Sequence, residues 1–398
     1  MKRIAIVGAG QSGLQLALGL QQNGHDVTLI SNRSAGQFRS GRVTSTQIMY
    51  DRAMRTERAL GIDLWERSAP DVHYLSMSVG HPLDRASTLC DWSGRFQAPA
   101  QSVDQRVKFA DWIELFEQRG GTLRIADADV ATLEALADDH DLVVVAAGKG
   151  DLVQIFERDP ARSMFDRPQR ALGLIYVNGV DAGDAPDKGY IDISPNIGEL
   201  VSFPALTTSG PCDVMLFEGL PDGPMDCWRP DFSAGEFVDT AKRLVSTYFP
   251  WRAPRYARIE LTDANAVLCG RLAPTVRKPV ARLPSGRPVL GMADVVVVND
   301  PISGQGSNSA ALCADLYLRR ILDHGDQPFD AGWMGDTFEM FWRYAHYVSS
   351  FTGMLLKGTP NVVNAVISAG ASTDLADAFA HGLNDPRTFG TWLMPNYH

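Results

Sequence analysis

The sequence predicts an α/β protein with a doubly wound parallel sheet, a second sheet of antiparallel strands and a helical C-terminal section. Three observations support this fold class. A strand, a glycine-rich turn and a helix occupy residues 1–23, short apolar runs between turn residues fill 168–270, and aromatic residues at helical spacing follow from Phe329. A strand, a crossover helix and a second strand at the start of a chain are the usual opening of a doubly wound sheet.

The first sheet is predicted from separate parts of the chain. Residues 3–7 are short, β-branched and followed by glycine, as in a buried parallel strand. Residues 11–23 carry leucine and alanine at helical spacing and end before Gly24, and residues 27–30 form the next strand. Further strands are expected at 142–147, 289–292 and 295–298, with helices at 107–118 and from about 307 to 322.

The middle of the chain has a different pattern, because its short apolar runs are separated by Gly, Pro, Asp and Asn. This pattern is typical of antiparallel sheet. We therefore expect a discontinuous cofactor domain, an inserted substrate-binding sheet domain and C-terminal helices. The predicted boundaries are 1–70, 100–167 and 271–327 for the first domain, 71–99 and 168–270 for the second, and 328–398 for the helical section.

Composition excludes several classes of protein. The chain has 398 residues, of which 37 are basic and 47 acidic, so it lacks the dense basic face that binds nucleic acid. Its five cysteines and eight histidines show no spacing typical of a disulfide framework or a metal site. Its apolar runs are far shorter than the ~20 residues of a membrane span, and glycine at position 8 interrupts any signal-peptide core. We expect a cytoplasmic protein without a metal, a membrane or a nucleic-acid partner.

Gly8, Gly10 and Gly13 form a G-x-G-x-x-G turn between the first predicted strand and helix. The first glycine makes the tight turn, the second lets the backbone approach a pyrophosphate, and the third packs the helix on the strand. The helix N-terminus then faces the phosphates. Ala17 and Gly24 extend the pattern at a spacing typical of flavin-binding folds. The alternative is a glycine turn without a ligand.

The position expected to bind ribose departs from the usual pattern. A carboxylate is expected at the end of the second strand, but the chain has Ser31, Asn32 and Arg33 there. Ser31 or Asn32 could bind the ribose while Arg33 stacks on adenine, and Arg33 could alternatively indicate a phosphorylated ribose. This departure weakens an assignment of NAD more than one of FAD.

A second candidate binding stretch lies near residue 300. Asp294 follows a predicted strand, where a carboxylate can accept a hydrogen bond from a ribityl hydroxyl. The next loop places helix-terminal N–H groups where a flavin ring and its phosphate could lie. A solvated Asp and an ordinary helix-starting loop are the alternative for either piece alone, but together with the N-terminal turn they indicate a flavin site. The candidate residues are Asp294, Pro301, Gly304, Gln305, Gly306 and Asn308.

Ordered matches along the chain resemble the FAD monooxygenases with the aromatic-hydroxylase fold, and among them the two-component styrene and indole epoxidases. The resemblance implies a Rossmann-like, glutathione-reductase-like FAD-binding domain with an antiparallel substrate sheet and C-terminal helices. Arg42 and Arg106 are candidates for holding the flavin, and Lys149 for its adenine end; each could instead be a surface residue. The matching segments are 8–13, 40–42, 98–99, 103–106, 148–149, 165–172 and 300–306.

Six positions separate the two substrate classes of this family. Styrene-type members carry Asn, Val and His at alternate positions after the Arg42 loop, and Tyr, His and Ser further on. The first three positions here would project from one face of a strand, unless the strand is half exposed and its polar residues are accidental. The residues at these positions resemble the indole-type branch and are Ser45, Gln47, Met49, Val72, Leu75 and Ala100.

The resemblance implies that reduced FAD and O₂ form a C4a-(hydro)peroxide that epoxidises indole at C2–C3, leading to indoxyl and indigo. The cofactor supplies this chemistry, so no acid–base residue is expected. The protein excludes water and positions the small aromatic substrate. Gln47 or Ser45 could accept a hydrogen bond from the indole N–H group.

The source of the reduced flavin also follows from the resemblance. Single-component hydroxylases of this fold carry an Asp-Gly motif where this chain has Ala147-Gly148-Lys149-Gly150, and no second dinucleotide turn follows a strand. We expect an external NADH-dependent flavin reductase, which docks or releases flavin by diffusion. The alternatives are a styrene-preferring epoxidase, a single-component NAD(P)H-dependent aromatic hydroxylase and a non-enzymatic FAD-binding protein. Flavin halogenases share the fold, but their Trp-x-Trp-x-Ile-Pro motif does not occur here.

Overall fold

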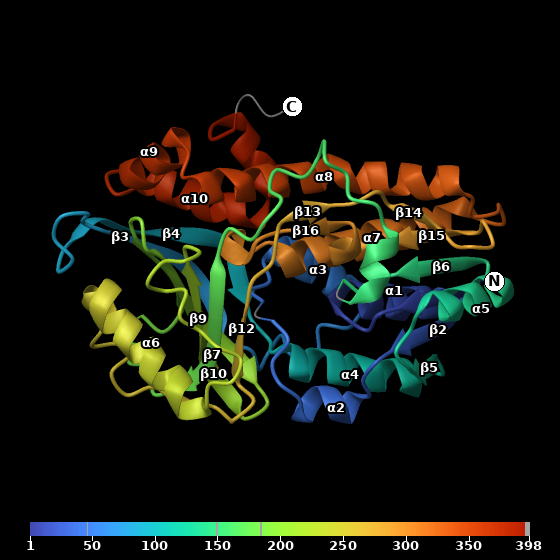
Figure 1. The fold of residues 1–398 in the computed structure, drawn as a ribbon, viewed down its shortest axis with the longest axis horizontal. Coiled ribbons are helices and arrows are strands. Elements are labelled where there is room, and N and C mark those ends of the chain that lie inside the picture. Colours follow the sequence, from blue (N-terminus) through green and yellow to red (C-terminus); the bar gives the residue numbers. More distant parts are fainter. Residues whose placement is uncertain (46, 149, 184, 395–398) are drawn as a thin grey trace.

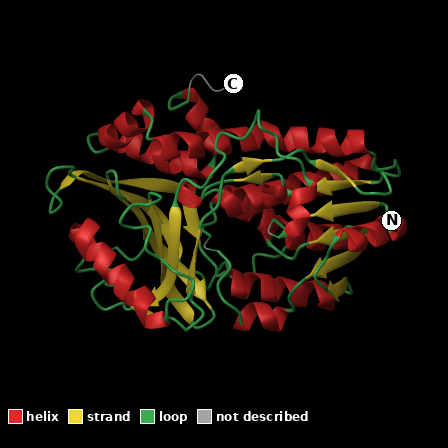
Figure 2. Cartoon of the chain, in the orientation of Figure 1, coloured by secondary structure: helices red, strands yellow, loops and turns green. Residues whose placement is uncertain are grey.

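The computed structural model describes residues 1–45, 47–148, 150–183 and 185–394. Two sheets lie toward opposite ends of the long axis of the molecule, and the C-terminal helices run along one side of both (Figure 1). Figure 2 shows the strands concentrated in these two regions, with helices around them. Among the described residues, every helix is too short or too polar to span a lipid bilayer.

Six strands form the first sheet: β1 (Arg3–Val7), β2 (Asp26–Ser31), β5 (Thr122–Ile125), β6 (Leu142–Val145), β14 (Val280–Arg282) and β15 (Pro288–Gly291). Their order across the sheet is β14-β15-β6-β1-β2-β5. β1 pairs in parallel with both β2 and β6. Four consecutive residues of β1 are buried, as expected for a strand covered on both faces.

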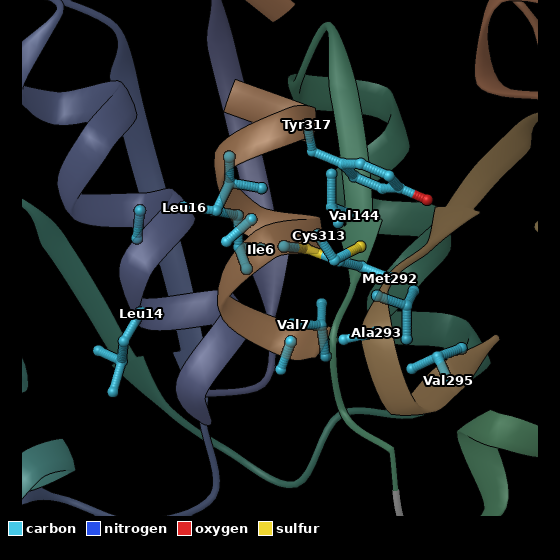
Figure 3. Close-up of a cluster of buried hydrophobic side chains, with 14 of the residues drawn as sticks. Ile6, Val7, Leu14, Leu16, Val144, Met292, Ala293, Val295, Cys313 and Tyr317 are labelled. Atoms are coloured by element: carbon cyan, nitrogen blue, oxygen red, sulfur yellow. The ribbon is translucent and has the colours of Figure 1, made fainter. Parts of the chain in front are cut away.

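The helix α1 (Gln11–Gln22) follows β1 and is buried from its first residue to Leu20. It packs against α4 (Gln105–Gln118) and α7 (Gly306–His324). Figure 3 shows side chains of β1, β6, α1 and α7 meeting in one apolar cluster. The other elements of this half are α2 (Ala35–Ser40), α3 (Asp51–Ala59), α5 (Val130–Asp139), η1 (Asp151–Ile155), η3 (Ala293–Val295), η4 (Pro301–Ser303), β13 (Thr275–Val276) and β16 (Val297–Val298).

Eight strands form the second sheet: β3 (Asp71–Gly80), β4 (Thr88–Gln101), β7 (Ala171–Asn178), β8 (Lys188–Ser194), β9 (Gly198–Thr207), β10 (Gly210–Gly219), β11 (Glu260–Leu261) and β12 (Val267–Gly270). Their order is β11-β7-β10-β9-β8-β3-β4, and β12 also pairs with β7. All pairs are antiparallel except that of β3 with β8. The helix α6 (Ala234–Tyr248), followed by η2 (Pro250–Arg252), packs on one face through buried residues such as Phe237 and Leu244.

The C-terminal section is helical, as predicted, and comprises α8 (Ala331–Lys357), α9 (Pro360–Ala369), α10 (Thr373–Asn384) and η5 (Pro386–Thr391). α10 lies directly on β4, because a Cβ atom at Gly94 would overlap the carbonyl oxygen of Ala376. The indole ring of Trp92 donates to the carbonyl oxygen of Val366 at 2.9 Å, which attaches α9 to the same strand. These helices therefore form a cover over one edge of the second sheet.

Most predicted elements are confirmed within a few residues at their ends, but two are wrong. Residues 295–298 do not form one strand; they are divided between the short helix η3 and the two-residue strand β16. Residues 45–49 are irregular in their described part, with a single bridge between Met49 and Gln101. The helix predicted at 107–118 begins earlier, at Gln105, because Asp104 caps it. The residue boundaries of the three domains stay predictions.

Candidate active site

A single continuous cavity of about 1770 Å³ is bounded by the first sheet, the inner face of the second sheet and the C-terminal helices. Sites for small molecules usually measure about 300–1,000 Å³, so this cavity has room for a dinucleotide and a further ligand. Its walls change from glycine and polar residues around α1 to apolar residues along β3, β8 and α9. The two ends therefore suit two chemically different ligands.

The turn between β1 and α1 has the geometry that its glycines predict. Gly8 has a φ of +118°, and a Cβ atom there would lie 2.6 Å from the backbone nitrogen of Ala147. A Cβ atom at Gly13 would overlap the carbonyl oxygen of Gly8. Gly10, by contrast, has open space around it and lines the cavity with Gly8, whereas Gly13 lies behind them. The open surface at Gly10, before the N-terminus of α1, fits a pyrophosphate.

The end of β2 contributes two of its three predicted residues to the cavity. Asn32 and Arg33 line the cavity, and the Arg33 guanidinium lies 5.7 Å from the centre of the Phe38 ring. Ser31 is buried, and its hydroxyl donates to the carbonyl oxygen of Arg33 at 2.6 Å while accepting from the Arg33 N–H at 3.1 Å. Ser31 therefore holds the turn that presents Asn32 and Arg33.

A buried ion pair lies beneath the turn, and sequence reasoning missed it. The Lys108 ammonium lies 2.6 Å from Oε1 of Glu57, and both side chains are 2% exposed. The same Oε1 accepts from the side-chain amide of Gln11 at 2.8 Å, and Gln11 lines the cavity. Burial raises the pKa of Glu57, and the charge of Lys108 opposes that rise. The pair fixes a side chain at the first position of α1, 46 residues away from Glu57 along the chain.

Asp294 reaches the cavity from a strained turn. The preceding residue, Ala293, has a φ of +50°, a backbone conformation that residues other than glycine rarely adopt. A Cβ atom at Gly148 would lie 2.6 Å from the Cβ atom of Asp294, so glycine at 148 permits this close approach. Asp294 is exposed and lines the cavity. Lys149 lies outside the described residues.

The loop before α7 forms a second helix N-terminus at the cavity. Pro301, Gly304 and Gly306 line the cavity, and no side chain caps α7 among the described residues. Gly304 has a φ of +62°, and a Cβ atom there would lie 3.1 Å from the hydroxyl oxygen of Tyr50. Backbone N–H groups at such a terminus attract an electron-rich group.

Two other predicted residues of this loop point away from the cavity. The Gln305 side-chain amide donates to the carbonyl oxygen of Leu383 at 2.7 Å. The Asn308 side chain accepts from the N–H of Tyr50 and donates to the carbonyl oxygen of Ile48, both at 2.8 Å. Neither residue lines the cavity. Both instead fix the loop to α10 and to the segment that carries Gln47.

The two predicted arginines have different environments. Arg42 is exposed and lines the cavity. Arg106 is 2% exposed, outside the cavity wall, and its guanidinium donates to Asp104 at 2.9 Å and to both carboxylate oxygens of Asp263 at 2.9 Å. Burial lowers the pKa of Arg106, but the bonds to Asp263 and Asp104 outweigh burial and raise it. Moving the Arg106 side chain toward a flavin would leave the buried Asp104 carboxylate without its cation, which is costly.

The six substrate positions are not all at the cavity. Ser45, Gln47, Val72 and Leu75 line it, but Met49 and Ala100 do not. Met49 packs with Ala53, Met54 and Ala311, because the irregular segment does not keep the alternation of a strand. Ala100 lies opposite Val72 in the pairing of β4 with β3 and is fully buried.

Gln47 has an unusual hydrogen-bonding environment. The residue is 3% exposed, and its side-chain amide nitrogen donates to the carbonyl oxygen of Val103 at 2.8 Å. Its amide oxygen, Oε1, accepts no hydrogen bond from the described part of the chain. Because the carbonyl oxygen of Val103 can only accept a hydrogen bond, the atom facing it must be the amide nitrogen, and the other atom is the oxygen. Gln47 lines the cavity, but this oxygen has almost no accessible surface there, so a ligand donor could satisfy it only after a shift of the side chain.

Val72 and Leu75 both reach the cavity although a regular strand would place them on opposite faces. The pairing of β3 with β4 shifts register between Val72 and Tyr74, which resets the alternation. From Leu75 onward the alternation continues with Met77 and Val79, which sequence periodicity could have found. The remaining apolar wall, which sequence reasoning missed, includes Tyr50, Phe96, Ile191, Ile193, Phe203, Phe351 and Leu383.

The glycine turn, the second helix N-terminus and the apolar sheet wall together define a flavin-dependent oxygenase. The residues present fit FAD, since Gly10 leaves room for the pyrophosphate and Asp294 presents a carboxylate to the same cavity. Residues 148–255 match the family model "Styrene monooxygenase A putative substrate binding domain". Styrene monooxygenase StyA of Pseudomonas fluorescens is 30% identical over 332 residues, 81% of this chain and 78% of that protein. A protein of the same name from Pseudomonas sp has the same identity and coverage. The chain belongs to the styrene monooxygenase family and is an FAD-dependent monooxygenase.

Solved structures of low sequence identity confirm the fold class. A triple mutant of the flavin-dependent brominase Bmp2 superposes with a TM-score of 0.69 at 12% identity, covering 99% of both chains. For 2-methyl-3-hydroxypyridine-5-carboxylic acid oxygenase the TM-score is 0.63 at 15% identity, covering 96% of both chains. Aklavinone-11 hydroxylase in complex with FAD and aklavinone gives 0.61 at 17% identity, covering 89% of this chain and 68% of that one.

Proposed function

We propose that the chain is the oxygenase component of a two-component monooxygenase that epoxidises indole at C2–C3, with indoxyl and indigo as later products. One observation carries the choice of indole: Gln47 lines the cavity, and its Oε1, which neighbouring atoms shield from the empty cavity, has no donor among the described residues. Substrate binding would bring this oxygen into contact with the substrate. Indole has an N–H group that can donate to this oxygen. Styrene has no donor and would leave the oxygen unpaired.

The free energy involved is large enough to select a substrate. A buried polar atom without a partner costs about 1–3 kcal/mol. Gln47 is held by Val103, so it cannot turn its amide nitrogen toward the cavity without losing that bond. The apolar residues Val72 and Leu75, which line the same cavity, suit the hydrocarbon part of an indole ring. Recognition of the N–H group then orients the C2–C3 bond.

The proposed cofactor contacts follow the polar end of the cavity. Gly8, Gly10 and the N-terminus of α1 hold the pyrophosphate, and Asn32 and Arg33 hold the adenosine. The ribityl chain and the ring are held by Asp294, Arg42, Pro301, Gly304 and Gly306. Reduced FAD, when bound, supplies the oxygen-activating chemistry. The protein excludes water and fixes the substrate beside it, and no acid–base side chain is assigned.

The reduced flavin is proposed to come from a separate NADH-dependent flavin reductase in the cytoplasm. The support is the strand end 146–148, which lacks the Asp-Gly motif of single-component hydroxylases, and the presence of one dinucleotide turn in the chain. The names of the curated relatives favour a second candidate, a styrene-preferring epoxidase. Both candidates use the same cavity and cofactor.

The deciding experiment compares kcat/KM for indole and styrene with reduced FAD supplied by a generic reductase. Gln47→Leu keeps the size of the side chain and removes the acceptor, so the indole-to-styrene ratio should fall by about 5- to 150-fold, the equivalent of 1–3 kcal/mol. Met49→Leu, a change outside the cavity wall, is the control and should leave the ratio unchanged. A wild-type preference for styrene, or an unchanged ratio in Gln47→Leu, would refute indole as the substrate. Blue pigment in cells that express the protein is the simplest supporting observation.

A further inference from the structure

The exposed residues that line the cavity differ in chemistry at its two ends. Around the predicted FAD site they are mostly charged and include Arg42, Asp127, Asp129, Asp151 and Asp294. At the other end they come from the hairpin between β3 and β4, from α9 and from Lys357 and Gly358 just before it. Figure 1 shows these two elements at the opposite end of the long axis from β1 and β2. The cavity therefore has exposed residues in a mostly charged region and in a mainly apolar region.

Three large apolar side chains form the rim of the second opening. Leu89 at the start of β4 is 46% exposed, and Val363 and Ile367 in α9 are 44% and 40% exposed. All three line the same cavity. Val363 and Ile367 are four residues apart and thus lie on the same side of their helix. We define these three residues as the apolar mouth.

The mouth belongs to an ordered part of the structure. Trp92 on β4 is bonded to the carbonyl oxygen of Val366 on α9, which holds the strand and the helix together beside the mouth. Behind the rim, the cavity continues between Val79 and Ile193 of the sheet and Val362 and Val366 of α9. Lys357 is the charged lining residue nearest in sequence to α9, and its ammonium lies 5.6 Å from the centre of the Phe165 ring.

We infer that the small neutral aromatic substrate enters through the apolar mouth formed by Leu89, Val363 and Ile367, and that FAD reaches its site from the polar side of the cavity. An apolar molecule gains favourable contacts along an apolar passage, and the predicted FAD site lies at the other, polar end of the cavity. With separate routes, a bound flavin does not block the substrate. The inference rests on the proposed function in one respect, that the substrate is small, neutral and aromatic.

The first test uses the full chain without FAD and prodan, a neutral fluorescent naphthalene, in a stopped-flow instrument. Ile367→Glu and Val363→Glu place a charge in the mouth without filling the interior. Prodan would enter and leave through the same mouth, so a barrier there slows both steps. We therefore expect its association and dissociation rate constants to fall by the same several-fold factor, with an unchanged Kd. Matched controls are Met340→Glu and Leu64→Glu, which alter apolar residues of similar exposure (39% and 48%) outside the cavity.

The second test uses the FAD-loaded enzyme and indole. Where substrate entry limits kcat/KM, we expect it to fall by the same several-fold factor as the association rate of prodan, while kcat and FAD affinity stay constant. Mouth variants that behave like the two controls, or that change the Kd for prodan without slowing association, would overturn the inference. If wild-type enzyme does not oxidise indole, the proposed function fails, but the prodan measurement still decides the route.

Discussion

Glu218 on β10 and Asp300 before η4 form a buried carboxyl pair. Both oxygens of Glu218 and Oδ2 of Asp300 accept no hydrogen bond from the described residues. Burial raises the pKa of Glu218 well above its usual range, and the charge of Asp300 adds to the rise. Burial raises the pKa of Asp300 to about 6. The nearby Arg170 does not neutralise the pair, because its guanidinium donates hydrogen bonds to both carboxylate oxygens of Glu199, at 2.8 and 2.9 Å.

This pair predicts a pH-dependent stability. A carboxyl group whose pKa is raised in the folded state stabilises the fold below its unfolded pKa and loses that contribution as pH rises through the folded value. For Asp300 the window extends from 3.8 to about 6, which corresponds to about 3 kcal/mol. The unfolding free energy of the wild-type protein should fall as the pH rises through this window, and Asp300→Asn should remove the contribution of Asp300 to that fall. The measurement is urea unfolding of FAD-free protein from pH 4.5 to 8, with Asp127→Asn as an exposed control. An unchanged pH profile in Asp300→Asn would contradict the prediction.

Gly10 and Gly13 have different surroundings, so alanine substitutions at these two positions should affect FAD binding and protein stability differently. Gly10→Ala adds a methyl group to open space. It should therefore leave the unfolding free energy of FAD-free protein nearly unchanged but weaken the binding of FAD. An overpacking cost of about 1–3 kcal/mol corresponds to about 5- to 150-fold in Kd. Gly13→Ala adds a methyl group that overlaps Gly8 and should destabilise FAD-free protein as well. Urea unfolding and ultrafiltration with FAD give the two quantities. Equal losses of stability would show that Gly10 has no ligand-specific role.

The Glu57–Lys108 pair predicts a strong non-additive effect. Lys108→Met leaves the buried Glu57 without its cation and should cost about 3–5 kcal/mol. Replacing both residues by methionine removes the unpaired charge and should recover most of that loss. The check is a double-mutant cycle by urea unfolding, with FAD affinity recorded in parallel because Gln11 bonds to Glu57. Additive losses would indicate that the two side chains act independently.

The proposed dependence on an external reductase gives a direct kinetic prediction. FAD-loaded protein mixed anaerobically with NADH or NADPH should keep its yellow colour over the time of a catalytic turnover, because the chain has no assigned site for the nicotinamide. A catalytic amount of flavin reductase added to the same mixture should bleach it. Rapid bleaching without the reductase would favour a single-component hydroxylase.

Local sequence pattern was sufficient for the elements that hold the dinucleotide turn. The buried run 3–7, the three glycines and the helix after them specify one another over short distances, because turn geometry and apolar periodicity are local properties. The α7 N-terminus and its loop could be predicted for the same reason. The antiparallel sheet was predicted from its turn residues, although its strand order was not. Family resemblance added Gln47, whose environment no periodicity indicates.

Tertiary structure decided which of the predicted side chains reach the cavity. Arg106, Gln305 and Asn308 had the expected positions in the chain, but packing directed them to Asp263, Leu383 and Tyr50, which are distant in sequence. The Glu57–Lys108 pair and the mouth on α9 likewise join residues whose proximity depends on the whole fold. Sequence by itself determined the fold class and one binding turn, because these follow from short-range geometry. The cavity wall required the structure, because it is made where distant elements meet.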